Sequence, residues 1–195
     1  MNKAANNDYI QRFRNTFNIE DGQINYEPVV VPEYIYNFDV EYPNAEGSKV
    51  DTLFSMLYHT NRAFSMIDKW EKEHNEKFDC VLFYRADIDS SESFPMVTPE
   101  ENVVYIPEGG DFAIDFHNGN GGINGQIAYG TYDVMKKYSN IVGNLEKLSG
   151  EQKMIMHPET LLYKHLQNEG VKTARFPFVY KLHESRHAPL PEYDA

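Results

Sequence analysis

The chain has 195 residues, of which 41% are hydrophobic, and a formal net charge of −12. This composition excludes a disordered chain and predicts one domain, residues 1–195, with its own core. The acidic charge, without a cluster of Lys or Arg, excludes nucleic acid as a partner. The single cysteine, Cys80, excludes an internal disulfide. Because no signal peptide and no membrane-spanning apolar run is present, we expect a cytoplasmic protein without a membrane span.

The N-terminal half predicts two helices and two extended regions. Apolar spacing predicts a helix over residues 8–18, with Asp8 as its N-cap. Residues 27–40 contain a β-branched run interrupted by Pro32, which is typical of an edge strand or of two short strands. An apolar stripe at helical spacing predicts a long amphipathic helix over residues 48–77. The nearly continuous apolar run at 78–85 then predicts a strand that is covered on both faces.

The C-terminal half predicts further strands and helices around a glycine-rich region. We expect a loop at 90–101, a strand at 102–107, and an irregular segment at 108–126 that contains a short strand at 112–116. Helical spacing returns at 123–148. Residues 157–170 form a well-delimited helix, with Pro158 and Glu159 in its first turn and Gly170 at its C-terminal end. A closing strand at 171–183 and a surface tail at 184–195 complete the chain.

These elements together predict the α/β class. A helix that leads directly into a doubly covered strand is typical of an α/β sheet. We therefore expect a single domain in which a mixed, mostly parallel central sheet is flanked by helices.

Two aspartates follow the buried strand at 78–85, in the sequence "RADID". If the strand ends at Arg85, the carboxylates of Asp87 and Asp89 lie in the loop at its carboxyl end, where open α/β sheets bind ligands. Two close carboxylates repel each other and favour a bound cation at neutral pH. A hard divalent cation such as Mn²⁺ or Mg²⁺ takes oxygen ligands and often bridges to ligand phosphates. The alternative is a solvated aspartate pair in an ordinary turn.

One enzyme class with a similar motif is the haloacid-dehalogenase-like phosphatases, with "GDFAID" at 110–115 as their second motif. The sequence argues against this class, because Arg85 and Ala86 separate the apolar strand from Asp87, and Ser91 replaces the expected Thr or Val. The interval between the two motifs is also too short for the helices that normally lie there.

The chain also resembles metal-dependent glycosyltransferases of the GT-A fold, in which a D-x-D motif ends a central strand. The resemblance covers roughly residues 55–171, through the helix and "RADID" block, the "NGQIAYGTYDVMKKYSNI" block and the "HPETLLYKHLQNEGV" block. It extends to viral and bacterial members, among them the capsid-glycan transferases of chloroviruses, which are associated with rhamnose transfer. The resemblance implies transfer of a sugar from a UDP-sugar, such as UDP-rhamnose or UDP-glucose, to a glycan hydroxyl. It favours retention of the anomeric configuration, whereas inversion would need a carboxylate base, with Asp115 and Glu159 as candidates. For a viral chain it also implies capsid glycoprotein glycosylation in the host cytoplasm.

The resemblance assigns roles to particular side chains. Asp87 and Asp89 match the metal-binding aspartates, Arg85 matches the arginine before them, and Asn61 and Arg62 on the preceding helix would face the nucleotide. Tyr129 would line the sugar pocket. We expect three residues to act at the sugar or as a base: Asp115, Gln126 and Glu159.

Two features of the predicted site stay open. His183 is a candidate third metal ligand, with His187 and His117 as alternatives. No apolar strand precedes residue 8 to grip a uridine, so the chain is a fragment, uses residues 28–31 as its first strand, or holds the nucleotide differently. A non-catalytic glycan-binding or assembly module with the same fold is the competing function.

Overall fold

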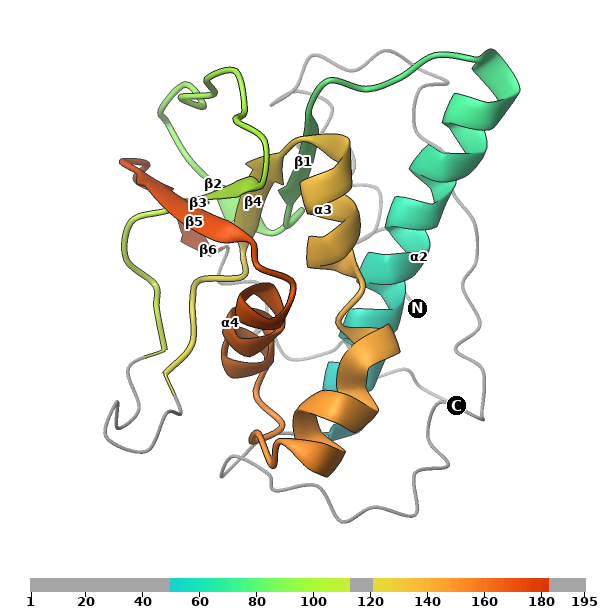
Figure 1. Cartoon of the computed structure of the whole chain (residues 1–195). Helices are drawn as coiled ribbons and strands as arrows, with labels where there is room; N and C mark the ends of the chain where they lie inside the picture. Colours follow the sequence, from blue (N-terminus) through green and yellow to red (C-terminus); the bar gives the residue numbers. More distant parts are fainter. Residues whose placement is uncertain (1–49, 113–120, 183–195) are drawn as a thin grey trace, which may run out of the picture.

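The structure is a computed structural model that describes residues 50–112 and 121–182 (Figure 1). The helices of this part are α2 (Val50–His74), α3 (Tyr132–Ser139) and α4 (Pro158–Asn168). A 3-10 turn, η3 (Val142–Asn144), and a π-helical turn, η4 (Glu146–Glu151), connect α3 to α4. The strands are β1 (Val81–Tyr84), β2 (Ile88–Asp89), β3 (Val103–Pro107), β4 (Ile127–Gly130), β5 (Lys172–Phe176) and β6 (Lys181–Leu182).

Four strands form the main sheet in the order β1-β4-β3-β5, and β2 pairs with β6 in a separate antiparallel ribbon. The α/β class and the mixed sheet are confirmed, but the prediction of a mostly parallel sheet is wrong for the described strands. β4 runs antiparallel to both β1 and β3, and only β3 and β5 are parallel. The connections account for this difference: a helical crossover leads into β5, whereas residues 121–126, the described residues that lead into β4, form no helix.

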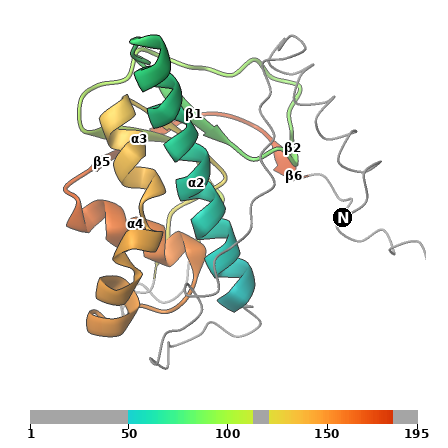
Figure 2. The same cartoon turned by 90° about the vertical axis from the view of Figure 1, so that its right-hand side faces the viewer.

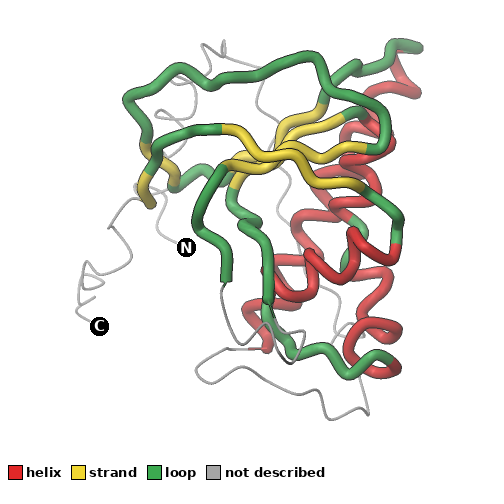
Figure 3. Tube along the Cα trace, turned by 60° about the vertical axis from the view of Figure 1, so that its left-hand side comes forward, coloured by secondary structure: helices red, strands yellow, loops and turns green. Residues whose placement is uncertain are grey.

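Helices cover one face of the sheet. Figure 3 shows the helices gathered on one side of the strands, and Figure 2 shows α2 running beside α3. The predicted apolar stripe of α2 contributes Leu53, Phe54, Leu57 and Phe64, which pack with residues of α3 and α4 and with the sheet residues Val104 and Ile106. Such burial stabilises the fold by about 1.5–3 kcal/mol for each large side chain.

The opposite face of the sheet carries aromatic side chains, which we call the aromatic face: Phe94, Tyr105, Tyr129, Phe176 and Phe178. Tyr105 and Tyr129 stack across β3 and β4 with ring centroids 4.7 Å apart. Phe94, from the loop that follows β2, meets Tyr129, Phe176 and Phe178 edge-on at 5.8, 5.5 and 5.2 Å. β1 therefore has packed neighbours on both faces, as predicted, but loop and C-terminal residues cover the second face.

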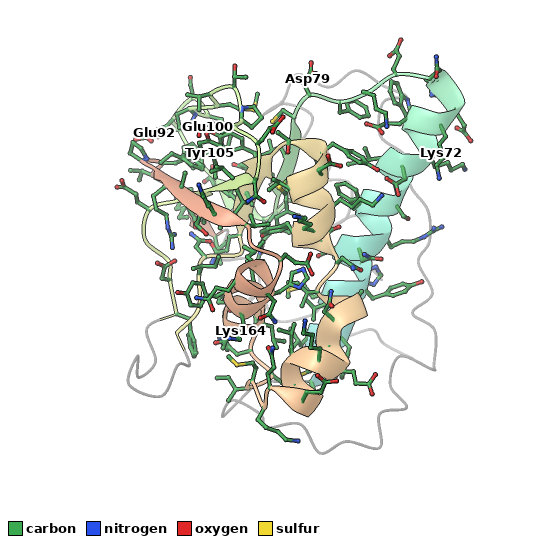
Figure 4. The ribbon with its side chains drawn as sticks, in the orientation of Figure 1. Lys72, Asp79, Glu92, Glu100, Tyr105 and Lys164 are labelled. Atoms are coloured by element: carbon green, nitrogen blue, oxygen red, sulfur yellow. The ribbon has the colours of Figure 1, made fainter. Side chains whose placement is uncertain are left out.

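The loop at 90–101 is fastened to this aromatic face by two tyrosine hydroxyls. The backbone N–H of Val97 donates to the Tyr129 hydroxyl at 3.3 Å, and that of Glu100 donates to the Tyr105 hydroxyl at 3.4 Å. Glu100 and Tyr105 lie close together in Figure 4, beside the strands. The predicted loop is thus confirmed as a segment without helix or strand, and Phe94 packs against the aromatic face while most other residues of the loop are exposed.

Several predicted elements agree with the structure. α2 confirms the long helix, and β1 and β3 confirm the strands at 78–85 and 102–107. α4 confirms the helix at 157–170, with Pro158 in its first turn and Gly170 at a φ of +66°, which glycine adopts without strain. No helix within the described residues is both long enough and apolar enough to cross a bilayer.

Two predicted elements need correction. Residues 127–130 form the buried strand β4, and α3 begins only after Thr131, whose hydroxyl accepts a hydrogen bond from the N–H of Val134. The closing strand at 171–183 is divided, because Pro177 follows β5 and has no N–H for a strand ladder. The elements predicted at 8–18 and 27–40, most of the strand at 112–116, and the tail at 184–195 lie outside the described residues.

Candidate functional site

A cavity of about 700 Å³ lies between the carboxyl end of β1 and the three helices. Its volume is typical of a small-molecule site. Buried apolar side chains of α2, α4 and the residues after α3 form part of the wall, among them Leu57, Ile141 and Leu162. Polar side chains come from the turn after β1, the residue before β4 and the first turn of α4, and also from α2 and α3. A ligand in this cavity would meet both an apolar surface and hydrogen-bonding groups.

The turn after β1 holds a tight ion pair at the cavity wall. The N–H of Ile88 donates to the carbonyl of Arg85 at 3.2 Å, which closes a turn over residues 85–88. Within this turn the Arg85 guanidinium donates to both oxygens of Asp87, from Nε at 2.9 Å and from Nη2 at 2.7 Å. Both side chains are mostly buried, with 26% and 18% of their surface exposed. This bidentate geometry orients the Asp87 carboxylate and neutralises its charge.

Asp89 follows the turn, whereas Asp87 lies within it, and the two side chains have different surroundings. It lies in β2, opposite Lys181 of β6, and its carboxylate is 3.8 Å from the Lys181 ammonium. More than half of its side-chain surface is exposed, and Asp89 does not line the cavity, whereas Asp87 does. The turn at 85–88 has placed one predicted metal ligand at the cavity and the other in the exposed ribbon.

The opposite wall begins at the N-terminus of α4, where Glu159 lines the cavity. Its backbone carbonyl accepts a hydrogen bond from the N–H of Ile123 at 3.2 Å. Gly122 lies against the same helical turn so closely that an added Cβ would be 2.4 Å from the Glu159 carbonyl carbon. The close approach of residues 121–123 therefore fixes where the first turn of α4, and with it Glu159, can lie.

Glu159 is paired with His157, the N-cap residue of α4. Nδ1 of His157 is 3.3 Å from Oε2 of Glu159, and the His157 ring stacks on Phe112 with centroids 3.5 Å apart. Burial lowers the pKa of His157, and the negative charge of Glu159 partly opposes that shift. Sequence reasoning missed His157, although Pro158 in the first helical turn marks the preceding residue as the cap.

Two further residues, Gln126 and Tyr138, belong to the polar lining. Gln126 lines the cavity just before β4, and its N–H donates to the Asn124 side-chain oxygen at 2.9 Å. Tyr138 of α3 is buried, and its hydroxyl donates to the carbonyl of Gly125 at 3.4 Å. Burial is the main cause that raises the pKa of Tyr138, so the phenol stays neutral. Sequence reasoning missed Tyr138, because its spacing reads simply as the buried side of a helix.

Other predicted site residues lie elsewhere. Tyr129 is fully buried in the aromatic face, on the side of the sheet away from the cavity, so it does not line the cavity. Asn61 contacts the Asn140 side chain at 3.3 Å, and Arg62 is exposed beside Ser65; neither lines the cavity. The remaining candidates lie outside the described residues: Asp115, His117, His183 and His187.

The donor set fits a divalent cation only in part. Within residues 50–112 and 121–182, no three His, Cys, Asp or Glu side chains gather closely enough to hold a metal ion. A cation that takes its other ligands from phosphates and water needs only one or two carboxylates. Asp87 fits that single-carboxylate role, with a change in its contact to Arg85, whereas Asp89 is not part of the cavity lining.

The charges on the cavity wall restrict its ligands. Among the described lining residues, the one cation (Arg85) and the two carboxylates (Asp87 and Glu159) give a formal charge of −1. A bare diphosphate would therefore be repelled, whereas a cation–diphosphate complex or a neutral sugar would not. Comparison of the chain with protein-family models, with curated proteins and with solved structures finds no match.

Proposed function

We propose that the chain is a GT-A-like glycosyltransferase that moves a sugar from a nucleotide-diphosphate donor, a UDP-sugar, to a glycan hydroxyl. One observation carries the proposal: Arg85, Asp87, Gln126 and Glu159, which the sequence singled out from three separate blocks, all line one cavity. That cavity lies at the carboxyl end of β1, where an α/β sheet normally binds its ligand.

Each of these side chains has a role in this reaction. Arg85 offers a guanidinium to the diphosphate and holds Asp87 in place. Asp87 is the carboxylate that would bind Mn²⁺ or Mg²⁺ together with the phosphates; when bound, the cation stabilises the negative charge of the departing nucleotide diphosphate. Gln126 provides an amide for hydrogen bonds to sugar hydroxyls. Glu159 accepts a hydrogen bond from the sugar in a retaining reaction, which the sequence resemblance favours.

Calorimetric titration with UDP, with and without Mn²⁺, tests the proposal directly. The charge of −1 on the wall predicts that UDP binds at least tenfold more tightly with Mn²⁺. Asp87→Asn is expected to weaken Mn²⁺-dependent binding by about tenfold or more, because a charged ligand contact is lost. A hydrolysis screen over UDP- and GDP-sugars would then identify the donor.

Asp89→Asn is the matched control, since it removes the same charge two residues away but outside the cavity lining. We expect this variant to bind UDP within about threefold of the unchanged protein, because an exposed ion pair contributes little. UDP binding that is independent of Mn²⁺ and unaffected by Asp87→Asn would contradict the proposal.

The second candidate function is a glycan-binding module without catalysis. It is favoured by the lining charge of −1 together with the apolar wall, which suit a neutral sugar. A module of this kind would bind an oligosaccharide without Mn²⁺ and would release no nucleotide from any sugar donor. The same titrations and hydrolysis screen therefore separate the two functions.

A further inference from the structure

The pair formed by His157 and Glu159 has no evident structural purpose. The two facing atoms, His157 Nδ1 and Glu159 Oε2, are both buried and lie 3.3 Å apart. Neither has a hydrogen bond to any residue in the described part of the chain, and their own contact does not meet hydrogen-bond geometry. Buried polar atoms are normally satisfied, so two that face only each other beside a cavity call for an explanation in the function of that cavity.

The surroundings fix both members of the pair. The His157 ring lies nearly parallel to Phe112, with 20° between the ring planes, and its residue is the extended N-cap before Pro158. Gly122 closes on the backbone at Glu159 and leaves no room for a side chain. The helical turn that carries the carboxylate and the ring that lies behind it are therefore both held in place before any ligand arrives.

Two other titratable groups around the cavity, Tyr138 and Arg85, differ from this pair in their charge or in their partner. From α3 the buried phenol of Tyr138 faces the cavity and stays neutral, and at the end of β1 the Arg85 guanidinium is occupied by Asp87. Because burial lowers the pKa of His157, its imidazole is neutral near pH 7 and carries one N–H. The Glu159 carboxylate, with Oε2 3.3 Å from Nδ1, favours that N–H on Nδ1.

We propose that His157 is a positioning residue: a small rotation of the Glu159 carboxylate lets the Nδ1–H of His157, 3.3 Å away, donate to one of its oxygens, so that the other oxygen is presented to a hydroxyl group of the ligand in the cavity. The identity of that ligand as a sugar rests on the proposed function. His157 does not line the cavity, so it acts through Glu159 and need not contact the ligand.

Two substitutions distinguish the contribution of the His157 N–H donor from that of its ring stacking. His157→Asn retains an N–H donor near the position of Nδ1 but loses the stacking on Phe112. His157→Phe retains the stacking but has no donor. We expect His157→Phe to lower kcat/KM for sugar transfer roughly 10- to 100-fold, as for a lost hydrogen bond to a charged group, and His157→Asn to stay within about threefold. A larger loss in His157→Asn than in His157→Phe, with equal unfolding midpoints, would show that the ring and not the donor matters and would overturn the proposal.

A second measurement needs no enzymatic activity. The pKa of His157, followed by ¹⁵N NMR of the full chain, is expected to fall in Glu159→Gln, because the carboxylate that favours the charged imidazole is lost. An unchanged pKa would overturn the pairing even in an active enzyme. Absence of sugar transfer, together with a lowered pKa in Glu159→Gln, would refute the proposed function but support the pair. The two proposals therefore fail by different results.

Discussion

Gly122→Ala tests how the cavity wall is built. An alanine Cβ at this position would lie 2.4 Å from the Glu159 carbonyl carbon, 2.5 Å from the Thr160 nitrogen and 2.7 Å from the Glu159 Cβ. Ordinary van der Waals contact begins at 3.4 Å, so the shortest of these distances is about 1 Å too small. Two of the three atoms are backbone, so rotation of a side chain cannot relieve the clash, and either α4 or the segment at 121–123 must move.

The expected cost follows from that displacement. Overpacking of a well-filled site typically costs about 1–3 kcal/mol, which for a domain of this size lowers the unfolding temperature by roughly 2–12 °C. Because the first turn of α4 carries Glu159, ligand binding should weaken in the same variant. Urea and thermal unfolding followed by circular dichroism measure the loss of stability, and the UDP titration measures the loss of binding.

Gly125→Ala is the matched control for this substitution. Its added Cβ would meet only Leu162 Cδ2, at 3.3 Å, and a flexible side-chain end can yield by that amount. We expect Gly125→Ala to change the unfolding free energy by less than about 1 kcal/mol. Equal unfolding midpoints for Gly122→Ala and the unchanged protein would refute the idea that close backbone packing at residue 122 positions α4.

Two further predictions concern stability and ligand contact. His165 is buried and donates from Nε2 to the Lys137 carbonyl at 2.7 Å, and burial lowers its pKa. The unfolded chain therefore gains the proton first as pH falls below about 6.5, so stability decreases there by up to about 1.4 kcal/mol per pH unit. In His165→Gln, urea unfolding between pH 7 and 5 should show a shallower pH dependence, and an identical slope would contradict this assignment. Tyr129→Phe removes the acceptor for the Val97 N–H and should cost about 0.5–1.5 kcal/mol in the same assay while leaving UDP binding unchanged; weaker binding would place Tyr129 at the ligand after all.

The sequence predicted α2 and α4 well, because the signals for these two helices are local. The apolar stripe of α2 has helical period throughout, and α4 has both Pro158 and Gly170 as boundaries. β4 was predicted as helix because its four residues, "IAYG", are all buried and show no alternation. A short, fully buried strand cannot be distinguished from a helix by periodicity alone. The direction of β4 depends on its neighbours in the sheet, which periodicity does not report.

The candidate site was predicted in part. The chemistry of Arg85, Asp87, Gln126 and Glu159 was readable from their motifs, and these four line the cavity. The sequence does not show that Asp87 and Asp89 are separated. One backbone hydrogen bond, from the Ile88 N–H to the Arg85 carbonyl, decides whether the two aspartate side chains of a D-x-D motif point to the same side. Gly122 was visible only as part of a glycine-rich run, and its contact with α4 spans 37 positions of sequence.

The aromatic face also has a consequence for how the chain tolerates changes in length. Surface loops usually accept insertions, because their residues have few fixed partners. In the loop after β2, however, two contacts with the aromatic face set the spacing between Phe94 and Val97. The Phe94 ring packs against three aromatic rings, and the Val97 N–H donates to the Tyr129 hydroxyl. One residue inserted between Phe94 and Val97 would break one of these two contacts, as a register shift does in a strand. In a family of related chains, lengths should vary elsewhere before they vary between residues 94 and 97.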